Sequence, residues 1–382
     1  MGRYREVELD DLELTGERLL LRRWQPGDAG RVQAIMRDPS MTDYLALPSP
    51  YTAQDAREFV TEFGHEGRGA GTGLGSAVVE RGAGRLVGAC VLRLSGDPEI
   101  GFWIAPDARG LRYAREATAV LAQFAFERLA LPRVRLVCDV RNVASARSAM
   151  GAGFRFEGVG RHGVLGGGRN GVPVRHADLA RFARLASDPP GPVAPAFAPL
   201  PDGGLSDGVL RLRPLRPEDA PAYLAAEDAE ATRWGFTGEA MSADDAKTVT
   251  RRAGLDWLTG PAARFALEDI ESGRFAGELM VRRSGPPQVG GIGYTVHPDF
   301  RGRGYTARAL RLLAPWAFEQ AGFARLELGA KAGNIASQKA ALAGGFAHEA
   351  VRRGRLRDPD GTFSDEICFA RFAGGQVIRM SP

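Results

Sequence analysis

Two arginines alternate with two glycines in a short segment near residue 300, and this spacing is suited to holding an anion. The apolar run 292–296 before the segment predicts a buried strand, and the pattern from Ala307 onward predicts a long helix. Glycines at a strand-to-helix turn allow several backbone N–H groups to surround one anion, and the helix N-terminus adds partial positive charge. The sequence therefore predicts a diphosphate-binding loop formed by Arg301, Gly302, Arg303, Gly304, Tyr305 and Thr306.

The overall composition is that of an ordinary globular protein, with 44% hydrophobic and 25% charged residues in 382. The net charge of +4 is small for this length, so a dedicated nucleic-acid-binding protein is not expected, whereas a polyanionic cofactor is compatible. Cys90, Cys138 and Cys368 lie far apart in apolar runs, which predicts buried thiols, no metal site and a reducing compartment. The chain shows neither an apolar signal region nor a membrane-spanning stretch, so we expect a cytoplasmic protein that is not bound to a membrane.

Periodicity and turn residues divide the first half of the chain into alternating strands and helices. Pro26 opens the first predicted helix and Thr52 the second, the latter with the spacing of a capping box. The predicted order is a strand (19–23), two helices (29–36 and 53–63), three strands (76–80, 86–94 and 100–104), a helix (114–128), a strand (134–140), a helix opened by Asn142, and two strands near residue 154 and at 177–182. Adjacent strands before the long helix suggest antiparallel pairing, and the strand–helix–strand after it suggests a parallel crossover.

A proline-rich segment separates this half from the rest of the chain. Residues 187–204 contain six prolines, which would keep the backbone extended and prevent regular pairing. The sequence therefore predicts an N-terminal domain (1–186), a linker (187–204) and a C-terminal domain (205–382).

The same order of elements returns after the linker. Gly293, Asn334 and Gly345 each lie 192 residues after a matching residue, namely Gly101, Asn142 and Gly153. Each matching pair stands in a longer shared motif, such as Asn-x-x-Ser or Gly-Phe. A constant offset over several motifs indicates that the chain is an internal duplication.

With four motifs in a fixed order, each half resembles a domain of the GNAT N-acetyltransferase superfamily. The similar branch includes the ribosomal-protein N-terminal acetyltransferases and many small-molecule amine acetyltransferases. The matching motifs in the second half are Gly293-Tyr294, Arg301-Gly302-Arg303-Gly304-Tyr305, Asn334-Ile335-Ala336-Ser337 and Gly345-Phe346. The resemblance implies an α/β fold of two tandem domains, each a mixed and mostly antiparallel sheet flanked by helices. It also implies acetyl-CoA as acyl donor and a small-molecule or peptide amine as acceptor.

The two halves differ in the loop itself, where Arg112 occupies the position of Gly304. A side chain at this position would obstruct close approach of a diphosphate, although its guanidinium could instead meet a phosphate directly. We expect obstruction, so the first half should bind acyl-CoA poorly and the second half should be the catalytic one.

The resemblance assigns roles to several further residues of the second half. Backbone N–H groups around Thr295 and Val296 would polarise the thioester carbonyl. Asn334 would belong to the cofactor site while also serving as a helix N-cap. Ser337, in the first turn of that helix, would either donate a proton to the leaving thiolate or be an ordinary first-turn serine.

The general base is the least determined residue of the predicted site. Glu278 stands among apolar neighbours on a strand expected to flank the acceptor cleft, where its pKa would be raised, but it could equally be a solvated edge-strand glutamate. Other candidates are His297, Asp365 and Glu366. Glu99 in the first half holds a position that is often acidic in this branch, whereas the second half has Gly291 there.

Two further features have less definite interpretations. Trp234 is expected in a loop over the acceptor cleft, where it could shape the pocket. The basic run 352–357 could guide an acidic group, although a solvated face is the preferred interpretation.

The sequence therefore favours an acetyl-CoA-dependent N-acetyltransferase that works by direct attack in a ternary complex. The alternatives are a transferase of a larger acyl group with both halves active, and a non-catalytic acyl-CoA-binding or regulatory module. The protein is expected to be a monomer whose halves form an intramolecular pseudo-dimer, or a homodimer. The identity of the acceptor is not predicted, because acceptor loops vary independently of the CoA machinery.

Overall fold

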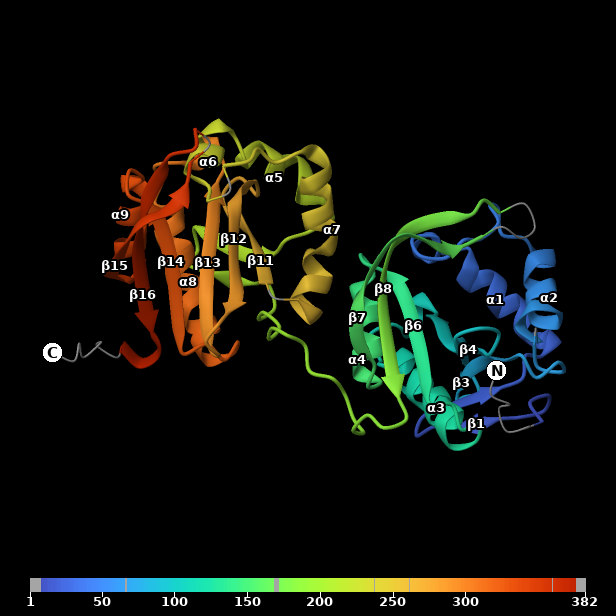
Figure 1. The fold of residues 1–382 in the computed structure, drawn as a ribbon. Helices are drawn as coiled ribbons and strands as arrows, with labels where there is room; N and C mark the ends of the chain where they lie inside the picture. Colours follow the sequence, from blue (N-terminus) through green and yellow to red (C-terminus); the bar gives the residue numbers. More distant parts are fainter. Residues whose placement is uncertain are drawn as a thin grey trace. The chain divides into compact units, whose positions relative to one another are not determined.

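The computed structural model of the chain describes residues 8–65, 67–167, 172–236, 238–260, 262–358 and 360–375. These residues form two compact units, divided between Ala194 and Pro195 (Figure 1). The division falls inside the predicted proline-rich linker. Each unit is an eight-stranded sheet with helices, as the resemblance implied.

The N-terminal unit follows the predicted order of elements, with one short additional strand at its start. Its elements are β1 (Leu14–Thr15), β2 (Leu19–Arg22), α1 (Ala29–Met36), α2 (Ala53–Thr61), β3 (Gly73–Glu80), β4 (Leu86–Arg93), β5 (Glu99–Ile104), α3 (Tyr113–Glu127), β6 (Arg133–Asp139), α4 (Val143–Gly151), β7 (Arg155–Gly166) and β8 (Arg175–Leu185).

The C-terminal unit repeats this order and adds one helix before its third strand. Its elements are β9 (Leu205–Ser206), β10 (Leu210–Pro214), α5 (Ala220–Ala226), α6 (Ala229–Trp234), α7 (Ala243–Thr259), β11 (Ala262–Asp269), β12 (Phe275–Ser284), β13 (Val289–Val296), α8 (Tyr305–Glu319), β14 (Arg325–Lys331), α9 (Ile335–Ala343), β15 (Ala347–Arg357) and β16 (Phe363–Phe372). The prediction of two helices here was wrong, because α6 is a separate helix of six residues, N-capped by Asp228.

Strand pairing is the same in both sheets. The orders are β1-β2-β3-β4-β5-β6-β8-β7 and β9-β10-β11-β12-β13-β14-β16-β15. The parallel pairs are β5 with β6 and β13 with β14, and the other pairs are antiparallel. A long crossover helix, α3 or α8, joins the two strands of each parallel pair, as such a connection requires.

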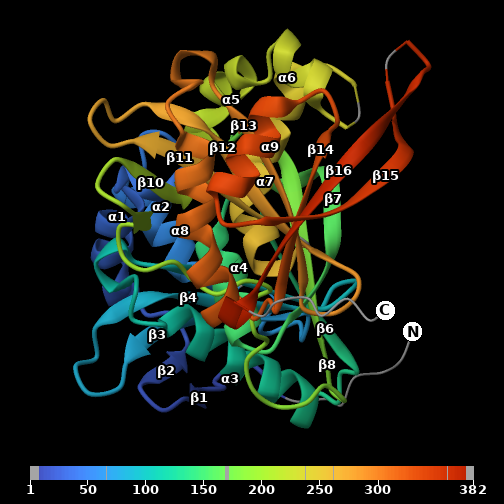
Figure 2. The same ribbon diagram turned by 90° about the vertical axis from the view of Figure 1, so that its left-hand side faces the viewer.

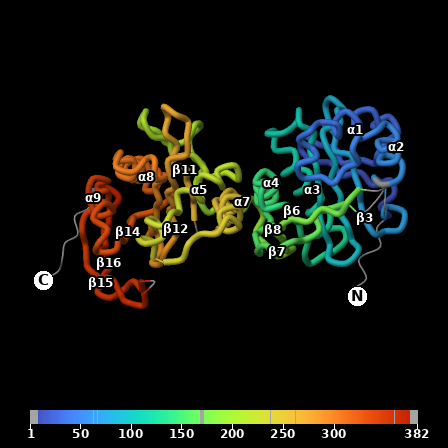
Figure 3. Tube along the Cα trace, turned by 90° about the horizontal axis from the view of Figure 1, so that it is seen from above, coloured from blue at the N-terminus to red at the C-terminus, as the bar shows by residue number. Residues whose placement is uncertain are grey.

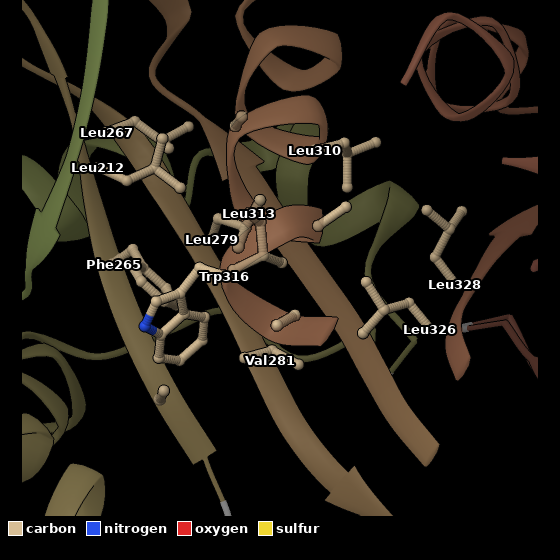
Figure 4. Packing of buried hydrophobic residues seen from close by; sticks show 14 of the residues in the cluster. Leu212, Phe265, Leu267, Leu279, Val281, Leu310, Leu313, Trp316, Leu326 and Leu328 are labelled. Atoms are coloured by element: carbon tan, nitrogen blue, oxygen red, sulfur yellow. The ribbon is translucent and has the colours of Figure 1, made fainter. Parts of the chain in front are cut away.

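Helices cover both faces of the C-terminal sheet, and Figure 3 shows α8 and α7 on opposite sides of its strands. Leu313 and Trp316 of α8 pack over Leu279 and Val281 of β12 in the main core cluster (Figure 4). Each of these fully buried side chains contributes about 2 kcal/mol of apolar burial. The opposite face packs a smaller cluster against α5 and α7 that includes Leu215, Tyr223, Ala246 and Ala266.

The proline-rich segment packs on the units at both of its ends. The N–H of Val193 donates to the carbonyl of Met150 in the N-terminal unit. Phe197 is 1% exposed in the C-terminal core, and the indole of Trp257 donates to the Ala198 carbonyl at 3.0 Å. Residues on either side of the division therefore belong structurally to their own unit.

The last hairpin, β15–β16, projects beyond the other strands of its sheet (Figure 2). β15 is exposed along nearly all of its length. Elsewhere, the three cysteines are buried and free, as predicted. Among the described helices, none is both long enough and apolar enough to cross a membrane.

Candidate functional site

The predicted anion loop of the C-terminal unit has the geometry of a backbone cradle. Gly302 and Gly304 both have positive φ angles, 76° and 73°, and Gly304 is the N-cap of α8. A Cβ added to either glycine would meet no atom within 4 Å, so both face open space. Within the described residues, no side chain caps the first turn of α8, which leaves its N–H groups available to an anion. The loop therefore fits a diphosphate group.

The side chain of Arg301 is directed to acidic residues of α6 and its N-cap. Its Nη2 lies 2.7 Å from a carboxylate oxygen of Asp228 and its Nη1 lies 2.7 Å from one of Glu230, and its Nε donates to the Val296 carbonyl at 3.2 Å. Hydrogen bonding to Asp228 raises the pKa of the Arg301 guanidinium above its ordinary value. Arg301 thus connects the anion loop to the segment that precedes α7, and its predicted role as a diphosphate ligand stays a prediction.

The other predicted ligands of the loop differ in what they present to an anion. Arg303 is exposed, and its guanidinium stacks over the ring of Phe300 at 5.1 Å. The Tyr305 side chain is buried in the core and its hydroxyl donates to Asp269, so only the backbone of Tyr305 can face the anion. Thr306 lies half-buried in the first turn of α8.

The corresponding loop of the N-terminal unit has nearly the same backbone. Arg112, the N-cap of α3, adopts φ 63° and ψ 18°, close to φ 73° and ψ 15° at Gly304. A left-handed conformation costs a non-glycine residue about 1 kcal/mol or more. The backbone cradle is therefore retained despite this cost, and the two loops differ through the Arg112 side chain rather than through the path of the chain.

The strands beside the loop separate at the point where an acyl group would have to lie. β13 pairs with β14 only from Val289 to Gly291, whereas Thr295 and Val296 pair with Glu278 and Gly277 of β12. Beyond Gly291, the β14-facing edge of β13 has no strand partner in the described part of the sheet. Backbone groups at Thr295 and Val296 thus border a gap between diverging strands, a usual ligand position in mixed α/β sheets.

Two hydroxyl groups meet across this gap. The Tyr294 hydroxyl lies 2.7 Å from Oγ of Ser337, and either atom can donate. Burial raises the pKa of Tyr294, so the hydroxyl keeps its proton at and above neutral pH. Asn334 is the N-cap of α9, and its Oδ1 accepts from the Ser337 N–H at 3.0 Å. This geometry confirms the N-cap interpretation of Asn334, while its predicted contact with the cofactor stays a prediction.

Tyr294 was missed as a site residue by the sequence analysis, which used it only as part of a motif. The available signal was its counterpart Phe102, 192 residues earlier, which has no hydroxyl. Ser145, the counterpart of Ser337, is held by the same N-cap contact to Asn142 at 3.0 Å.

Glu278 is neither a solvated edge residue nor a free carboxylate. It is 4% exposed, and its Oε1 accepts from Nη1 of Arg264 at 2.7 Å. Burial raises the pKa of Glu278, and Arg264 acts in the opposite direction. The solvated-edge alternative is therefore wrong, and Arg264 is a partner that the sequence analysis did not identify because it comes from the neighbouring strand β11.

The remaining acid–base candidates all have local partners. The Glu99 carboxylate lies 3.2 Å from Arg93 and 3.1 Å from Arg135. Nδ1 of His297 accepts from the Asp299 N–H at 3.3 Å.

The two acids of β16 are similarly engaged. Asp365 accepts from the Gly354 N–H at 2.8 Å, and Glu366 lies 3.4 Å from Arg352. Glu278 pairs across β12 and β13 with Thr295, at the end of β13 that borders the gap.

Trp234 was predicted to lie in a loop, but it is the last residue of α6. Arg233 stacks over its ring at 4.8 Å, and a Cβ on Gly333 would lie 3.3 Å from the ring. The ring therefore covers the turn between β14 and α9. The basic run at 352–357 lies on the exposed strand β15, in keeping with the preferred interpretation of a solvated face.

The N-terminal unit contains two neighbouring cavities. One has a volume of about 620 Å³ and passes between the separating strands β5 and β6, with Glu99 and Trp103 among its lining residues. The other, of about 510 Å³, lies between α2, the segment 44–51 and the end of β7. Cavities of this size accommodate small organic ligands, so this unit has retained space for a ligand.

Comparison with known families identifies both units. A family model described as an acetyltransferase (GNAT) domain matches residues 18–155 and, a second time, residues 210–347. A Bacillus subtilis protein described as the uncharacterized N-acetyltransferase YnaD is 27% identical over 150 residues, which are 38% of this chain and 85% of the relative. The uncharacterized N-acetyltransferase p20 of Bacillus licheniformis is 25% identical over 151 residues, 37% of this chain and 82% of the relative.

Solved structures that the chain matches include one of Mycobacterium smegmatis RimJ in complex with CoA-disulfide. It is 24% identical, with a TM-score of 0.39, over 47% of this chain and 90% of that one. A putative ribosomal-protein-serine acetyltransferase from Vibrio cholerae is 23% identical, with a TM-score of 0.40, over 46% of this chain and 98% of that one.

Proposed function

The chain belongs to the acetyltransferase (GNAT) family, with one domain in each unit, and from this premise we propose that it is an acetyl-CoA-dependent N-acetyltransferase whose C-terminal unit carries the chemistry. The observation that supports the choice of unit most directly is the Tyr294–Ser337 hydroxyl pair at 2.7 Å. It lies at the separation of β13 and β14, in the unit that also has Gly304 in its anion loop. The N-terminal unit has Phe102 and Arg112 in the two equivalent positions.

Bound acetyl-CoA would supply an acetyl group activated as a thioester. The N–H groups of the Gly302–Gly304 loop and the first turn of α8 would bind the diphosphate, because these donors surround open space. Beyond Gly291, where β13 no longer pairs with β14, a backbone N–H in the Thr295–Val296 stretch would donate to the carbonyl oxygen and stabilise the negative charge that develops on it.

The hydroxyl pair would supply the proton that the departing sulfur requires. Removal of Tyr294 from solvent raises its pKa, so its proton is retained at the pH of the reaction, and Ser337 can pass a proton along the 2.7 Å contact. The acceptor amine would attack as the neutral base in a ternary complex. Glu278 is the proposed acceptor of its proton, through an intervening water, because burial raises the pKa of this carboxyl.

The proposal is tested by measuring CoA release from acetyl-CoA with a panel of amines for the wild type, Tyr294→Phe and Phe102→Tyr. Loss of turnover in Tyr294→Phe alone supports catalysis in the C-terminal unit. Loss in neither variant, together with turnover by the wild type, refutes the role of the hydroxyl pair. Tight acetyl-CoA binding without turnover of any amine supports the alternative of a non-catalytic acyl-CoA-binding module. The amine that is turned over in this panel identifies the acceptor.

A further inference from the structure

Three aromatic rings form a cluster beside the cavities of the N-terminal unit. The ring centroids of Trp24 and Phe59 are 5.0 Å apart, those of Trp24 and Trp103 are 6.2 Å apart, and those of Phe59 and Trp103 are 6.4 Å apart. All three residues line the larger cavity, and Phe59 and Trp103 also line the smaller one. The cluster therefore presents aromatic surface to both cavities.

The C-terminal unit has no aromatic residue at the equivalent positions. Trp103 pairs with Ala89 as Thr295 pairs with Glu278, so Thr295 is the counterpart of Trp103. Phe59 and Val249 each lie seven residues after the N-cap of their helix. Trp24 lies two residues after Arg22, which pairs with Asp28. Leu215 lies two residues after Arg213, which pairs with Asp219 in the same way. The aromatic cluster is thus specific to one of two otherwise similar folds.

Acidic groups predominate among the charged residues that line these cavities. Asp55 and Glu58 of α2 line the smaller cavity, Glu99 and Asp139 line the larger one, and Arg93 lines both. Arg93 is already paired with Glu99 at 3.2 Å. Hydrogen bonds from Thr52 lower the pKa of Asp55, so it is ionised at neutral pH. Aromatic faces together with carboxylates favour a cation carried on an apolar body.

The larger cavity also reaches Phe102, Asn142 and Ser145 on the far side of the strand separation. Because Phe102 has no hydroxyl, a ligand here does not meet the hydroxyl pair that Tyr294 and Ser337 form in the other unit. We propose that the N-terminal unit is a non-catalytic binding site for an organic amine, held as a cation between the Trp24–Phe59–Trp103 cluster and the carboxylates of Asp55 and Glu58. That the site is non-catalytic rests on the proposed function, which places acetyl transfer in the C-terminal unit, whereas the binding of an amine here does not depend on which amine is acetylated.

The test is calorimetric titration of the full chain with 2-phenylethylamine, without acetyl-CoA, and with 3-phenylpropionate as the anionic counterpart. The amine should bind and the anion should not. Phe59→Ala and Glu58→Gln should each weaken amine binding at least about fivefold. Val249→Ala, the matched change in the C-terminal unit, should leave the affinity unchanged.

Circular dichroism and thermal unfolding of each variant show whether it is folded. Glu58 is a half-buried residue of α2 outside the core clusters, so Glu58→Gln still tests the site if Phe59→Ala unfolds. The proposal is overturned by an absence of binding at millimolar amine, by equal binding of the anion, or by an affinity that falls in Val249→Ala but not in Glu58→Gln. These outcomes measure amine binding alone, so a failure of the binding site can be distinguished from a failure of the proposed function, which is measured by acetyl transfer.

Discussion

The hydroxyl of Tyr294, at the splayed end of β13, lies 2.7 Å from Oγ of Ser337 in the first turn of α9. The two residues are 43 positions apart in the chain, and the separation of β13 from β14 gives their hydroxyls access to each other. In the N-terminal unit the contact cannot form, because Phe102 replaces the tyrosine. This pair distinguishes the two halves of the duplication chemically.

Tyr294→Phe should lower kcat by about 100-fold, the usual contribution of a positioned proton donor. The KM for acetyl-CoA should change little, because the diphosphate loop is untouched. Steady-state kinetics of CoA release checks both values. Burial raises the pKa of Tyr294, so the wild-type rate should not fall through tyrosine ionisation between pH 7 and about 9. The matched change Phe102→Tyr should be silent, and a similar loss of kcat in both variants contradicts the assignment.

Gly304→Arg should raise the KM for acetyl-CoA at least about tenfold, because a side chain would enter the space required by the diphosphate. The variant should still fold, since Arg112 already occupies the same backbone conformation in the N-terminal unit, at a cost of about 1–2 kcal/mol. Arg112→Gly is the matched control, and it should stabilise the N-terminal unit by about 1 kcal/mol. Thermal unfolding and acetyl-CoA titration measure the two effects. An unchanged KM in Gly304→Arg places the donor site elsewhere.

Arg301 and Asp228 should act as one unit. Arg301→Gln and Asp228→Asn should weaken acetyl-CoA binding to a similar extent, because each releases the anion loop from the N-terminus of α6. The double variant should lose little more than either single one, with a coupling of about 1 kcal/mol in a double-mutant cycle. If Arg301 is instead a direct diphosphate ligand, Arg301→Gln alone will weaken binding and the two changes will be additive.

Glu278 and Arg264 should be coupled in stability. Arg264→Met leaves a buried carboxylate without its partner, and it should lower the free energy of unfolding of the C-terminal unit by about 3 kcal/mol. Arg264→Met combined with Glu278→Leu should recover much of this loss, because both charges are then removed. Chemical denaturation followed by tryptophan fluorescence measures the difference. If the double variant is less stable than Arg264→Met, the loss of stability in Arg264→Met does not come from the unpaired Glu278 carboxylate.

The proposed catalytic role of Glu278 can be tested through the pH dependence of the reaction rate. Burial raises the pKa of Glu278. The carboxylate can therefore act as a base only when the pH is above the ordinary pKa range of glutamate. The acidic limb of kcat/KM should therefore lie above pH 4.5 and disappear in Glu278→Gln, together with most of the activity. A Gln variant with normal kcat and an unchanged pH profile assigns Glu278 a purely structural role.

The contact between Tyr305 and Asp269 should appear in the acid stability of the C-terminal unit. Hydrogen bonds from Ser272 and Tyr305 lower the pKa of Asp269 to about 2. The folded state therefore binds this proton less tightly than the unfolded chain, so the stabilisation is complete above pH 4 and is lost as the pH falls toward 2. In Tyr305→Phe, the midpoint of unfolding should depend less on pH between about pH 4 and pH 2 than it does in the wild type. Parallel curves for the wild type and the variant contradict the link.

Much of the fold could be predicted because its signals are local. The predicted helix 29–36 coincides with α1 (Ala29–Met36), and the predicted strand 100–104 with β5 (Glu99–Ile104), to within one residue. The capping box at Thr52 forms as its spacing indicated. The helix α6 was missed because six residues containing no strong apolar period carry little signal of their own, and its N-cap Asp228 resembles an ordinary loop aspartate.

The sequence by itself determined the duplication, the order of most elements and the positions of the two loops that precede α3 and α8. These properties depend on residue spacing, which a constant offset of 192 makes visible. Only the tertiary structure decided the partners of the site residues. Arg301 meets Asp228 from 73 positions away, Glu278 meets Arg264 across two strands, and three aromatic rings converge on the N-terminal cavities. Strand register and helix packing, rather than any local pattern, determine which of these distant side chains share one environment.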